Sequence, residues 1–306
     1  MPRLRVAARG SRLSLRQVEI AMEWLSKRIP GLSYTVLKIT TRGDVVRDKP
    51  IYLTGLRGAF EREVDKAVLE GLADVAVHSM KDLPSRLPNG LEIVAVPPRG
   101  SRYEALVPRK GLEALQPERL PPGSRVAAGS ARRRAMILHA NPRVEATWIR
   151  GNLDTRLRRL DEGRADYLVA AEAGLERLGV ERPWVRLPLI PYTPPPGQGL
   201  IAIVAPSESS VARLLRGASE PRAWAEALAE RVYLESLGGA CGRPIGGTAE
   251  AAGEGLVFTV GVYSPEGSRA LWARLRGGRP EDLAEEAARL AKSLEASLGA
   301  SGVEGV

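Results

Sequence analysis

The feature that most constrains the fold is an alternation of short apolar runs with stretches whose apolar residues recur at helical spacing. LRVAA (4–8) is followed by apolar residues three and four apart over 15–29, and then by YTVLKI (34–39). Two further apolar runs, DVAVHS (74–79) and LEIVAV (91–96), follow another helical stretch. Strands and helices that alternate in this way indicate an α/β domain built on a parallel sheet.

The alternation restarts after residue 100 and then meets a proline-dense segment. PLIPYTPPPGQG (188–199) cannot be helical and suits an extended crossing between domains. The apolar run LIAIVAP (200–206) is expected to return to the first sheet. The second part therefore predicts another α/β domain. Its expected strands are EALVP, SRVAA, RVEATWI and DYLVAA, and its expected helices are 131–140, 152–162 and 172–178.

The C-terminal part has a different pattern. A helix over 221–237 leads into a glycine-rich turn, LVFTVGVYS and RALWARLR alternate like a small antiparallel sheet, and a last helix covers 279–298. We therefore predict two similar periplasmic-binding-protein-like α/β lobes that form a cleft, and a small α+β C-terminal domain with an antiparallel sheet. The predicted boundaries are 1–98 with 197–217 for domain 1, 99–196 for domain 2 and 218–306 for domain 3.

Length and cysteine content limit the domains and the chemistry. At 306 residues the chain is long enough for two or three domains with cores of their own. A single cysteine excludes an internal disulfide and a multi-cysteine metal site, and no metal is expected. Neither a signal peptide nor an apolar run long enough to cross a bilayer is recognisable, so we expect a cytoplasmic protein with no membrane partner.

The chain is strongly basic, with a net charge of +9 and a pI near 10.0. A nucleic-acid-binding protein would have this charge, but it would also show a basic stripe or interleaved aromatic residues. Aromatic residues make up only 5% of the chain, and the arginines are dispersed. Many guanidinium groups also suit a ligand with several carboxylates, because arginine pairs with carboxylate through two hydrogen bonds. We favour this second use and expect no nucleic-acid partner.

The only cysteine, Cys241, lies in LGGACGRPIG (237–246). A structural cysteine usually lies in a helix or strand among apolar neighbours, whereas Cys241 is surrounded by glycines. Its sulfur is therefore either a reactive or derivatised thiol or part of an incidental small residue. The residues around it leave both interpretations open.

Three polar segments lie next to predicted strands or helices, where α/β proteins place working groups. HSMKDLP offers His78, Lys81 and Asp82. The plain alternatives are a hydrogen-bonded core histidine, which we favour for His78, and a solvated Lys–Asp turn. GSARRR (129–134) is either an anion site at a helix start or an exposed, charged helix start. RGNLDTRL (150–157) sets arginines on both sides of a turn.

Eight motifs occur in an order and spacing that match one known family. They are ARGSRLSLRQ (8–17), TRGD (41–44), HSMKDLP (78–84), GSARRR (129–134), RGNLDTRL (150–157), AGLERLG (173–179), GQG (197–199) and GGACGRPIG (238–246). In these segments the chain resembles the porphobilinogen deaminase family, also called hydroxymethylbilane synthase. The resemblance runs from residue 4 to about 250. HSMKDLP and RGN…TRL are each fairly specific, and their combination with a cysteine on a glycine turn argues against chance agreement.

The resemblance implies a transferase of tetrapyrrole (haem and sirohaem) biosynthesis. Family members deaminate four porphobilinogen molecules and join them head to tail into 1-hydroxymethylbilane. They do so on a dipyrromethane cofactor linked through a thioether to a cysteine, which Cys241 matches here. The family's catalytic carboxylate matches Asp82. A single buried carboxylate aimed at a pyrrole N–H would stabilise the cation that forms as ammonia leaves, and could assist the proton transfers.

Residues 41–58 are polar, contain Gly and Pro and lack a clear period, which favours a mobile lid over a packing feature. The resemblance also assigns the other polar positions and implies a monomer. Each pyrrole carries an acetate and a propionate, so the growing chain needs many cationic partners. Contacts with the cofactor would be made by Lys81, Asp82, Ser130, Arg132, Arg133, Arg156 and Gly199. Contacts with the substrate would be made by Arg9, Ser11, Gln17, Arg57, Phe60, Arg150 and Arg177.

The chain departs from the family's pattern in three motifs. The lid reads GLRGAF, with Arg57 in place of a lysine. Gly129 removes one hydroxyl contact at the start of GSARRR. Beside the anchoring cysteine, Gly242 replaces a polar residue and Arg243 is added. None of these changes removes a group that the implied mechanism needs.

Two other functions remain as alternatives. A non-catalytic clamshell binding protein for a polycarboxylate ligand would have no use for Cys241 or Asp82. A basic nucleic-acid-binding protein would concentrate arginines on one surface, and its affinity would fall steeply with salt. Neither alternative requires the cysteine and HSMKDLP in one chain.

Overall fold

The computed structural model describes residues 3–40, 61–239 and 242–300. Several predictions fall outside these ranges. They are the lid at 41–58, the substrate contacts Arg57 and Phe60, and the cofactor anchor Cys241.

The chain divides into two compact units. Unit 1 comprises Met1–Gly100 and Gly199–Ala227, and unit 2 comprises Ser101–Gln198 and Leu228–Val306. Helix α8 (Pro221–Ser236) contains the boundary between them. The three-domain division that the sequence suggests stays a prediction.

Unit 1 contains a five-stranded sheet in the order β2-β1-β3-β10-β4. β1, β2 and β3 are parallel, whereas β10 is antiparallel to both β3 and β4. The return of 200–206 to the first sheet is thus confirmed, and its antiparallel direction makes the sheet mixed. The chain enters β10 directly from unit 2. It does not pass through the helical crossover that a parallel neighbour would need, and β10 is therefore antiparallel. The strands are β1 (Arg3–Arg9), β2 (Ser33–Ile39), β3 (Val75–Ser79), β4 (Leu91–Ala95) and β10 (Ile201–Pro206).

Helices cover both faces of this sheet. Successive strand residues point to opposite faces: Val6 of β1 packs with Val18 of α1, and its neighbour Ala7 packs with Val64 of α3. A strand buried on both sides needs apolar residues at every position, which explains the uninterrupted apolar runs in the sequence. The unit's helices are α1 (Arg12–Ser26), the 3-10 helix η2 (Met80–Asp82), α3 (Arg62–Leu69) and α7 (Ser210–Leu215).

Unit 2 contains a second five-stranded sheet in the order β7-β6-β8-β5-β9. The helix predicted over 131–140 is α4, with the same bounds. The three-residue strand β9 was not predicted. The strands are β5 (Glu104–Pro108), β6 (Arg125–Ala128), β7 (Glu145–Trp148), β8 (Tyr167–Ala171) and β9 (Val185–Leu187). The helices are η3 (Pro117–Arg119), α4 (Ala131–Ala140), α5 (Leu153–Asp161) and α6 (Glu172–Arg177).

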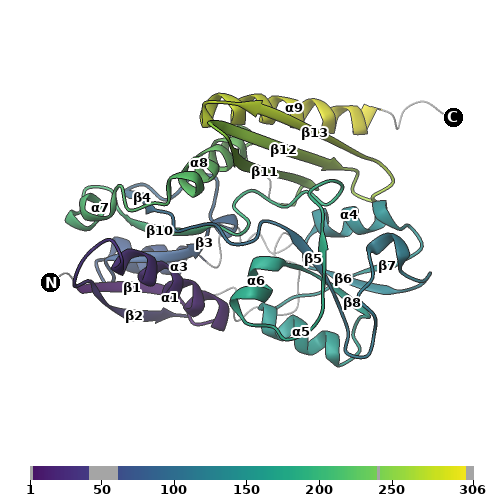
Figure 1. Cartoon of the computed structure of the whole chain (residues 1–306), viewed down its shortest axis with the longest axis horizontal. Coiled ribbons are helices and arrows are strands. Elements are labelled where there is room, and N and C mark those ends of the chain that lie inside the picture. The colour runs from purple at the N-terminus through teal and green to yellow at the C-terminus, as the bar shows by residue number, and fades with distance from the viewer. Residues whose placement is uncertain (1–2, 41–60, 240–241, 301–306) are drawn as a thin grey trace. The chain divides into compact units, whose positions relative to one another are not determined.

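The antiparallel sheet of unit 2 has the order β11-β12-β13, and α9 packs against β12 and β13 (Figure 1). β12 and β13 were predicted, but β11 was not, because its glycines resemble a turn. A Cβ at Gly246 would lie 2.5 Å from the carbonyl oxygen of Thr193. Glycine therefore lets a neighbouring backbone approach closely. The elements are β11 (Ile245–Ala252), β12 (Gly255–Tyr263), β13 (Ala270–Gly277) and α9 (Pro280–Ala300).

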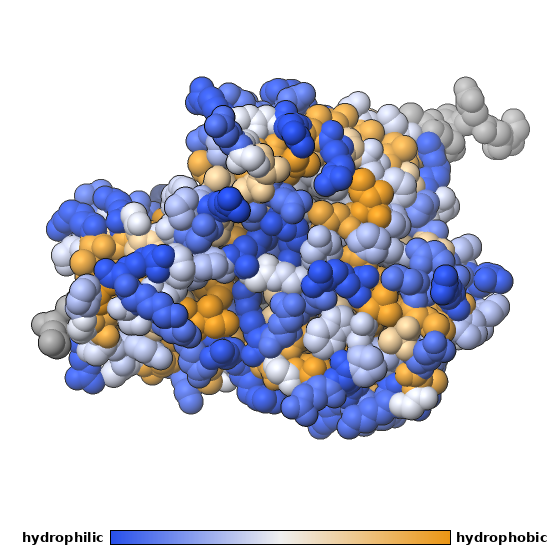
Figure 2. Space-filling view, in the orientation of Figure 1, coloured by the Kyte–Doolittle hydropathy of each residue, from blue (hydrophilic) through white to orange (hydrophobic). Residues whose placement is uncertain are grey.

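The predicted fold class is confirmed by two α/β sheets of five strands each and a small antiparallel sheet. The predicted cleft stays a prediction. On the face displayed in Figure 2, hydrophilic side chains are interspersed with smaller hydrophobic areas. Among the helices in the described ranges, none combines the length and apolar character needed to span a membrane.

Candidate active site

Asp82 lies where β3 ends. The strand passes directly into the short helix η2, whose last residue is Asp82. Two hydrogen bonds fix this junction: Met80 N donates to the carbonyl oxygen of Leu200 (3.1 Å), and Nε2 of Gln17 donates to Oγ of Ser79 (2.6 Å). The side chain of Asp82 is exposed, so the expectation of a buried carboxylate is wrong. A carboxylate at the end of a strand, on a single turn of helix, keeps access to solvent and therefore to a ligand.

A second carboxyl group near Asp82 was not predicted. Glu61 precedes α3 and is only 4% exposed. Burial and the negative charge of Asp82 raise the pKa of Glu61 to about 8, although the positive charge of Arg9 opposes the shift. Glu61 therefore holds a proton at neutral pH. A glutamate at the start of a helix is ordinarily a solvated charge, so the sequence contained no signal of this burial.

The protonation of Glu61 predicts how stability depends on pH. The folded chain keeps this proton up to about pH 8, and an unfolded chain releases it near the ordinary value of 4.5. The folded state binds more protons in this window, so the free energy of unfolding should fall as the pH rises from 4.5 to 8. Glu61→Gln removes the titrating group, and with it this pH-dependent loss of about a few kcal/mol in the free energy of unfolding. Compared with wild type, the variant should therefore be more stable at pH 8 than at pH 5.

Denaturant unfolding from pH 5 to pH 9 measures this effect. The control is Glu70→Gln, which removes an exposed carboxylate after the same helix. The unfolding free energy of Glu61→Gln minus that of the wild type should increase up to about pH 8 and then level off. A difference independent of pH would show that Glu61 is charged in the folded chain.

His78 is a core residue, as we expected. It is 6% exposed, and its Nε2 lies 2.9 Å from Oδ1 of the buried Asp65. This histidine belongs to the packing between β3 and α3.

The remaining unit 1 candidates lie at the ends of its elements. Arg9 is the last residue of β1 and is partly exposed, and Ser11 caps α1 by accepting a hydrogen bond from Ser14 N. Lys81 is partly exposed beside Asp82. Gly199 is buried with a φ of 85°, a conformation that favours glycine. Arg9 and Asp82 both act on the pKa of Glu61: the positive charge of Arg9 lowers it and the negative charge of Asp82 raises it.

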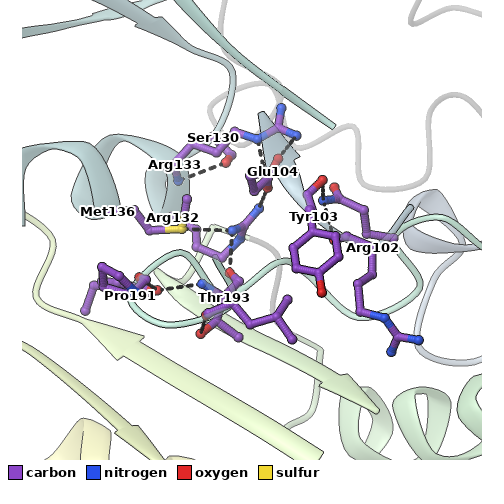
Figure 3. A network of polar contacts seen from close by, with 12 residues as sticks. Arg102, Tyr103, Glu104, Ser130, Arg132, Arg133, Met136, Pro191 and Thr193 are labelled. Carbon is purple, nitrogen blue, oxygen red and sulfur yellow. Dashed lines mark hydrogen bonds and ion pairs between the residues drawn. The ribbon is translucent and has the colours of Figure 1, made fainter. Parts of the chain in front are cut away.

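In unit 2 the structure brings three candidates together at the start of α4. Ser130 caps the helix by accepting a hydrogen bond from Arg133 N (3.3 Å). The side chains of Arg132 and Arg133 are 6% and 8% exposed, and both pair with Glu104 (Figure 3). This cluster is not the exposed, charged helix start that GSARRR left open.

Arg156 lies against the same helix start. A Cβ at Gly129 would lie 2.7 Å from Nη1 of Arg156, so the guanidinium group occupies the space that the missing side chain leaves. Nε of Arg156 donates to the carbonyl oxygen of Gly151 (2.7 Å). The departure at Gly129 therefore loses a hydroxyl group but admits a cation.

The two substrate candidates of unit 2 lie on other elements. Arg150 follows β7, and its Nη1 is buried without a hydrogen-bond partner among the described residues. A buried donor without a partner is costly, so this nitrogen suits a carboxylate oxygen supplied by a ligand. Arg177 ends α6, and burial lowers its pKa to about 10, which leaves it charged at neutral pH.

Glycines border the segment that contains Cys241. Gly239 and Gly242 have φ values of 87° and 84°, which strain other residue types. Arg243 pairs with Glu295 of α9, and its Nη1 donates to the carbonyl oxygen of Leu237 (3.2 Å). Arg243, which departs from the family's pattern, thus links Leu237 to α9.

The described candidate residues fit a group with several carboxylates. Five of them in unit 2 are arginines, one of which has an unsatisfied buried donor, and guanidinium groups match carboxylates in charge and geometry. In the ranges that the structure describes, no group of three or more His, Cys, Asp or Glu side chains is arranged to hold a metal ion.

Comparison with known proteins identifies the family. The model for the dipyrromethane cofactor binding domain of porphobilinogen deaminase matches residues 4–213, and the model for its C-terminal domain matches 224–298. A probable porphobilinogen deaminase of Hyperthermus butylicus is 44% identical over 98% of this chain and 99% of the relative. One from Aeropyrum pernix is 47% identical, covering 97% and 95%, and the porphobilinogen deaminase of Rubrobacter xylanophilus is 38% identical, covering 99% and 97%. The chain therefore belongs to the porphobilinogen deaminase family.

Proposed function

We propose that the chain is a transferase that deaminates four porphobilinogen molecules and joins them into 1-hydroxymethylbilane on a dipyrromethane cofactor held by a thioether to Cys241. The observation that carries this proposal is that the two family models match residues 4–213 and 224–298. The second of these ranges includes position 241. The non-catalytic alternative receives no support from the relatives, whose names are those of the enzyme.

The cofactor, when bound, supplies the covalent end onto which pyrrole units are added. We propose that it is held by Lys81, Asp82, Ser130, Arg132, Arg133 and Arg156, with Gly199 leaving room beside the rings. The structure supports this assignment through the gathering of Ser130, Arg133 and Arg156 at the start of α4. Cationic side chains and the N-terminal end of a helix both favour bound carboxylates.

The catalytic role belongs to Asp82 in this proposal. Its exposed carboxylate is able to accept a hydrogen bond from a pyrrole N–H, and its negative charge stabilises the cation that forms as the substrate loses ammonia. Because Glu61 is neutral at pH 7, Asp82 supplies this charge without a second carboxylate beside it.

The substrate contacts would come from Arg9, Ser11, Gln17, Arg57, Phe60, Arg150 and Arg177. Arg150 has the clearest structural support, because its buried Nη1 lacks a partner among the described residues. An acetate or propionate oxygen would satisfy it. A cytoplasmic location and a monomeric state also stay predictions.

Incubation of the purified chain with porphobilinogen tests the function. We expect release of ammonia, formation of 1-hydroxymethylbilane, and an intact mass that exceeds the sequence mass by two linked pyrrole units. Binding of porphobilinogen without ammonia release would instead favour the non-catalytic binding protein.

A further inference from the structure

A buried carboxylate that the sequence analysis did not single out connects two of the proposed cofactor residues. Glu104, the first residue of β5, is 0% exposed. Its Oε1 accepts hydrogen bonds from Nη2 of Arg132 (2.5 Å) and Nε of Arg133 (3.1 Å), and its Oε2 accepts one from Nη2 of Arg133 (2.6 Å). Figure 3 shows both guanidinium groups converging on this side chain.

These contacts fix the orientation of both arginines. Nη1 of Arg132 donates to the carbonyl oxygen of Thr193 (2.6 Å) and lies 3.0 Å from Sδ of Met136. Arg132 is therefore held from both ends of its guanidinium group. Arg133 is held through Nε and Nη2, which leaves its Nη1 outside the fork with Glu104. The protein alone determines both orientations, so the cost of ordering these long side chains is met before any ligand binds.

The charges of the cluster do not balance. Two buried guanidinium groups face one carboxylate, and the start of α4 adds positive potential. Uncompensated charge with so little exposure is unfavourable, and one further anion would relieve it. An acetate or propionate group of a pyrrole is such an anion. Glu104 thus reduces the repulsion between the two arginines and preserves a net positive charge.

We propose that Glu104 is a positioning residue of the cofactor site, which orients Arg132 and Arg133 so that they receive a carboxylate of the dipyrromethane. This inference rests on the proposed function, because it uses the cofactor role of the two arginines. Glu104 itself is fully buried and acts through them.

Cofactor loading tests the proposal separately from turnover. The full chain is produced in cells that cannot make porphobilinogen, porphobilinogen is added, and the gain of two pyrrole units is followed by intact mass. Glu104→Gln keeps the side chain's size but replaces one acceptor with a donor, and Glu104→Asp keeps the charge but is too short to span both arginines. We expect loading about 10- to 100-fold slower in Glu104→Gln, and a smaller loss in Glu104→Asp.

The matched control is Glu172→Gln, which removes another buried carboxylate of unit 2. Glu172 is 3% exposed and accepts hydrogen bonds from Ser101, Trp184 and Arg186, none of which is a proposed cofactor residue. Its variant should lose stability but load at the wild-type rate. This comparison separates positioning from a general loss of packing.

The outcomes distinguish this inference from the proposed function. If the wild-type chain gains no pyrrole units, the proposed function fails. If the wild type loads and Glu104→Asp loads equally fast, the positioning role fails whatever happens to Glu104→Gln. Failure of both Glu104 variants to fold would assign Glu104 to the core alone and would also overturn the proposal.

Discussion

Asp82→Asn is expected to lower turnover by about a hundredfold or more while leaving the chain folded. The amide retains the size of the side chain but not the charge that stabilises the substrate-derived cation, and loss of such a preorganised group typically costs this much. Because the side chain of Asp82 is exposed, its replacement should change the free energy of unfolding little. Asp82→Glu should retain the charge in a displaced position, and its loss should be intermediate.

Turnover is measured per loaded molecule, with the loaded fraction taken from intact mass. This normalisation matters because Asp82 is also a proposed cofactor contact. The control is Asp282→Asn, the same chemical change at an exposed position of α9. Near-normal turnover in loaded Asp82→Asn would remove the catalytic assignment.

The same variant carries a second signature in the pKa of Glu61. The charge of Asp82 is one cause of the raised pKa there, so Asp82→Asn should lower that pKa. The upper limit of the pH range over which the free energy of unfolding falls should then move to lower pH. A window that does not change would mean that the charge of Asp82 contributes nothing to the raised pKa of Glu61, and that burial and Asp65 account for it.

The elements that local pattern determines were predicted well. Both faces of the unit 1 sheet are covered, so Val6 and Ala7 both had to be apolar, and the run was visible as a strand. The helix over 131–140 directly follows Ser130, whose side chain caps the N-terminal end of the helix. β11 was missed because Gly246 serves a contact with Thr193, which is distant in sequence. No local pattern encodes such a contact.

The same distinction between local pattern and tertiary contact applies to the candidate site. Local pattern located HSMKDLP at a strand end and GSARRR at a helix start, whereas the roles of Asp82 and the arginines came from the family resemblance. Neither could show that Asp82 is exposed, or that Glu61 and Glu104 are buried beside the motif residues. Glu104 lies 28 positions from Arg132, and only the pairing of β5 within its sheet brings it to the start of α4. Partners of this kind depend on tertiary structure.

Cys241→Ser is expected to abolish both the added mass and the turnover. A thiol has a pKa near 8.5, so a few per cent is thiolate at neutral pH, whereas a serine hydroxyl is hardly ionised and a far weaker nucleophile. The variant should therefore show its sequence mass after incubation with porphobilinogen. Wild-type protein produced without porphobilinogen is the control, because it shares the unmodified state but should gain two pyrrole units when the substrate is supplied.

The single cysteine makes this prediction unusually direct. With one thiol per chain, reagent-accessible thiol under denaturing conditions reports the linkage without ambiguity: one per molecule before loading and none after it. Thiol loss and mass gain should therefore follow the same time course in the wild type. Two pyrrole units retained on Cys241→Ser, or a thiol still free in the loaded wild type, would place the linkage at another residue. Asp82 would then act on a chain anchored elsewhere, and the glycines around position 241 would need a different explanation.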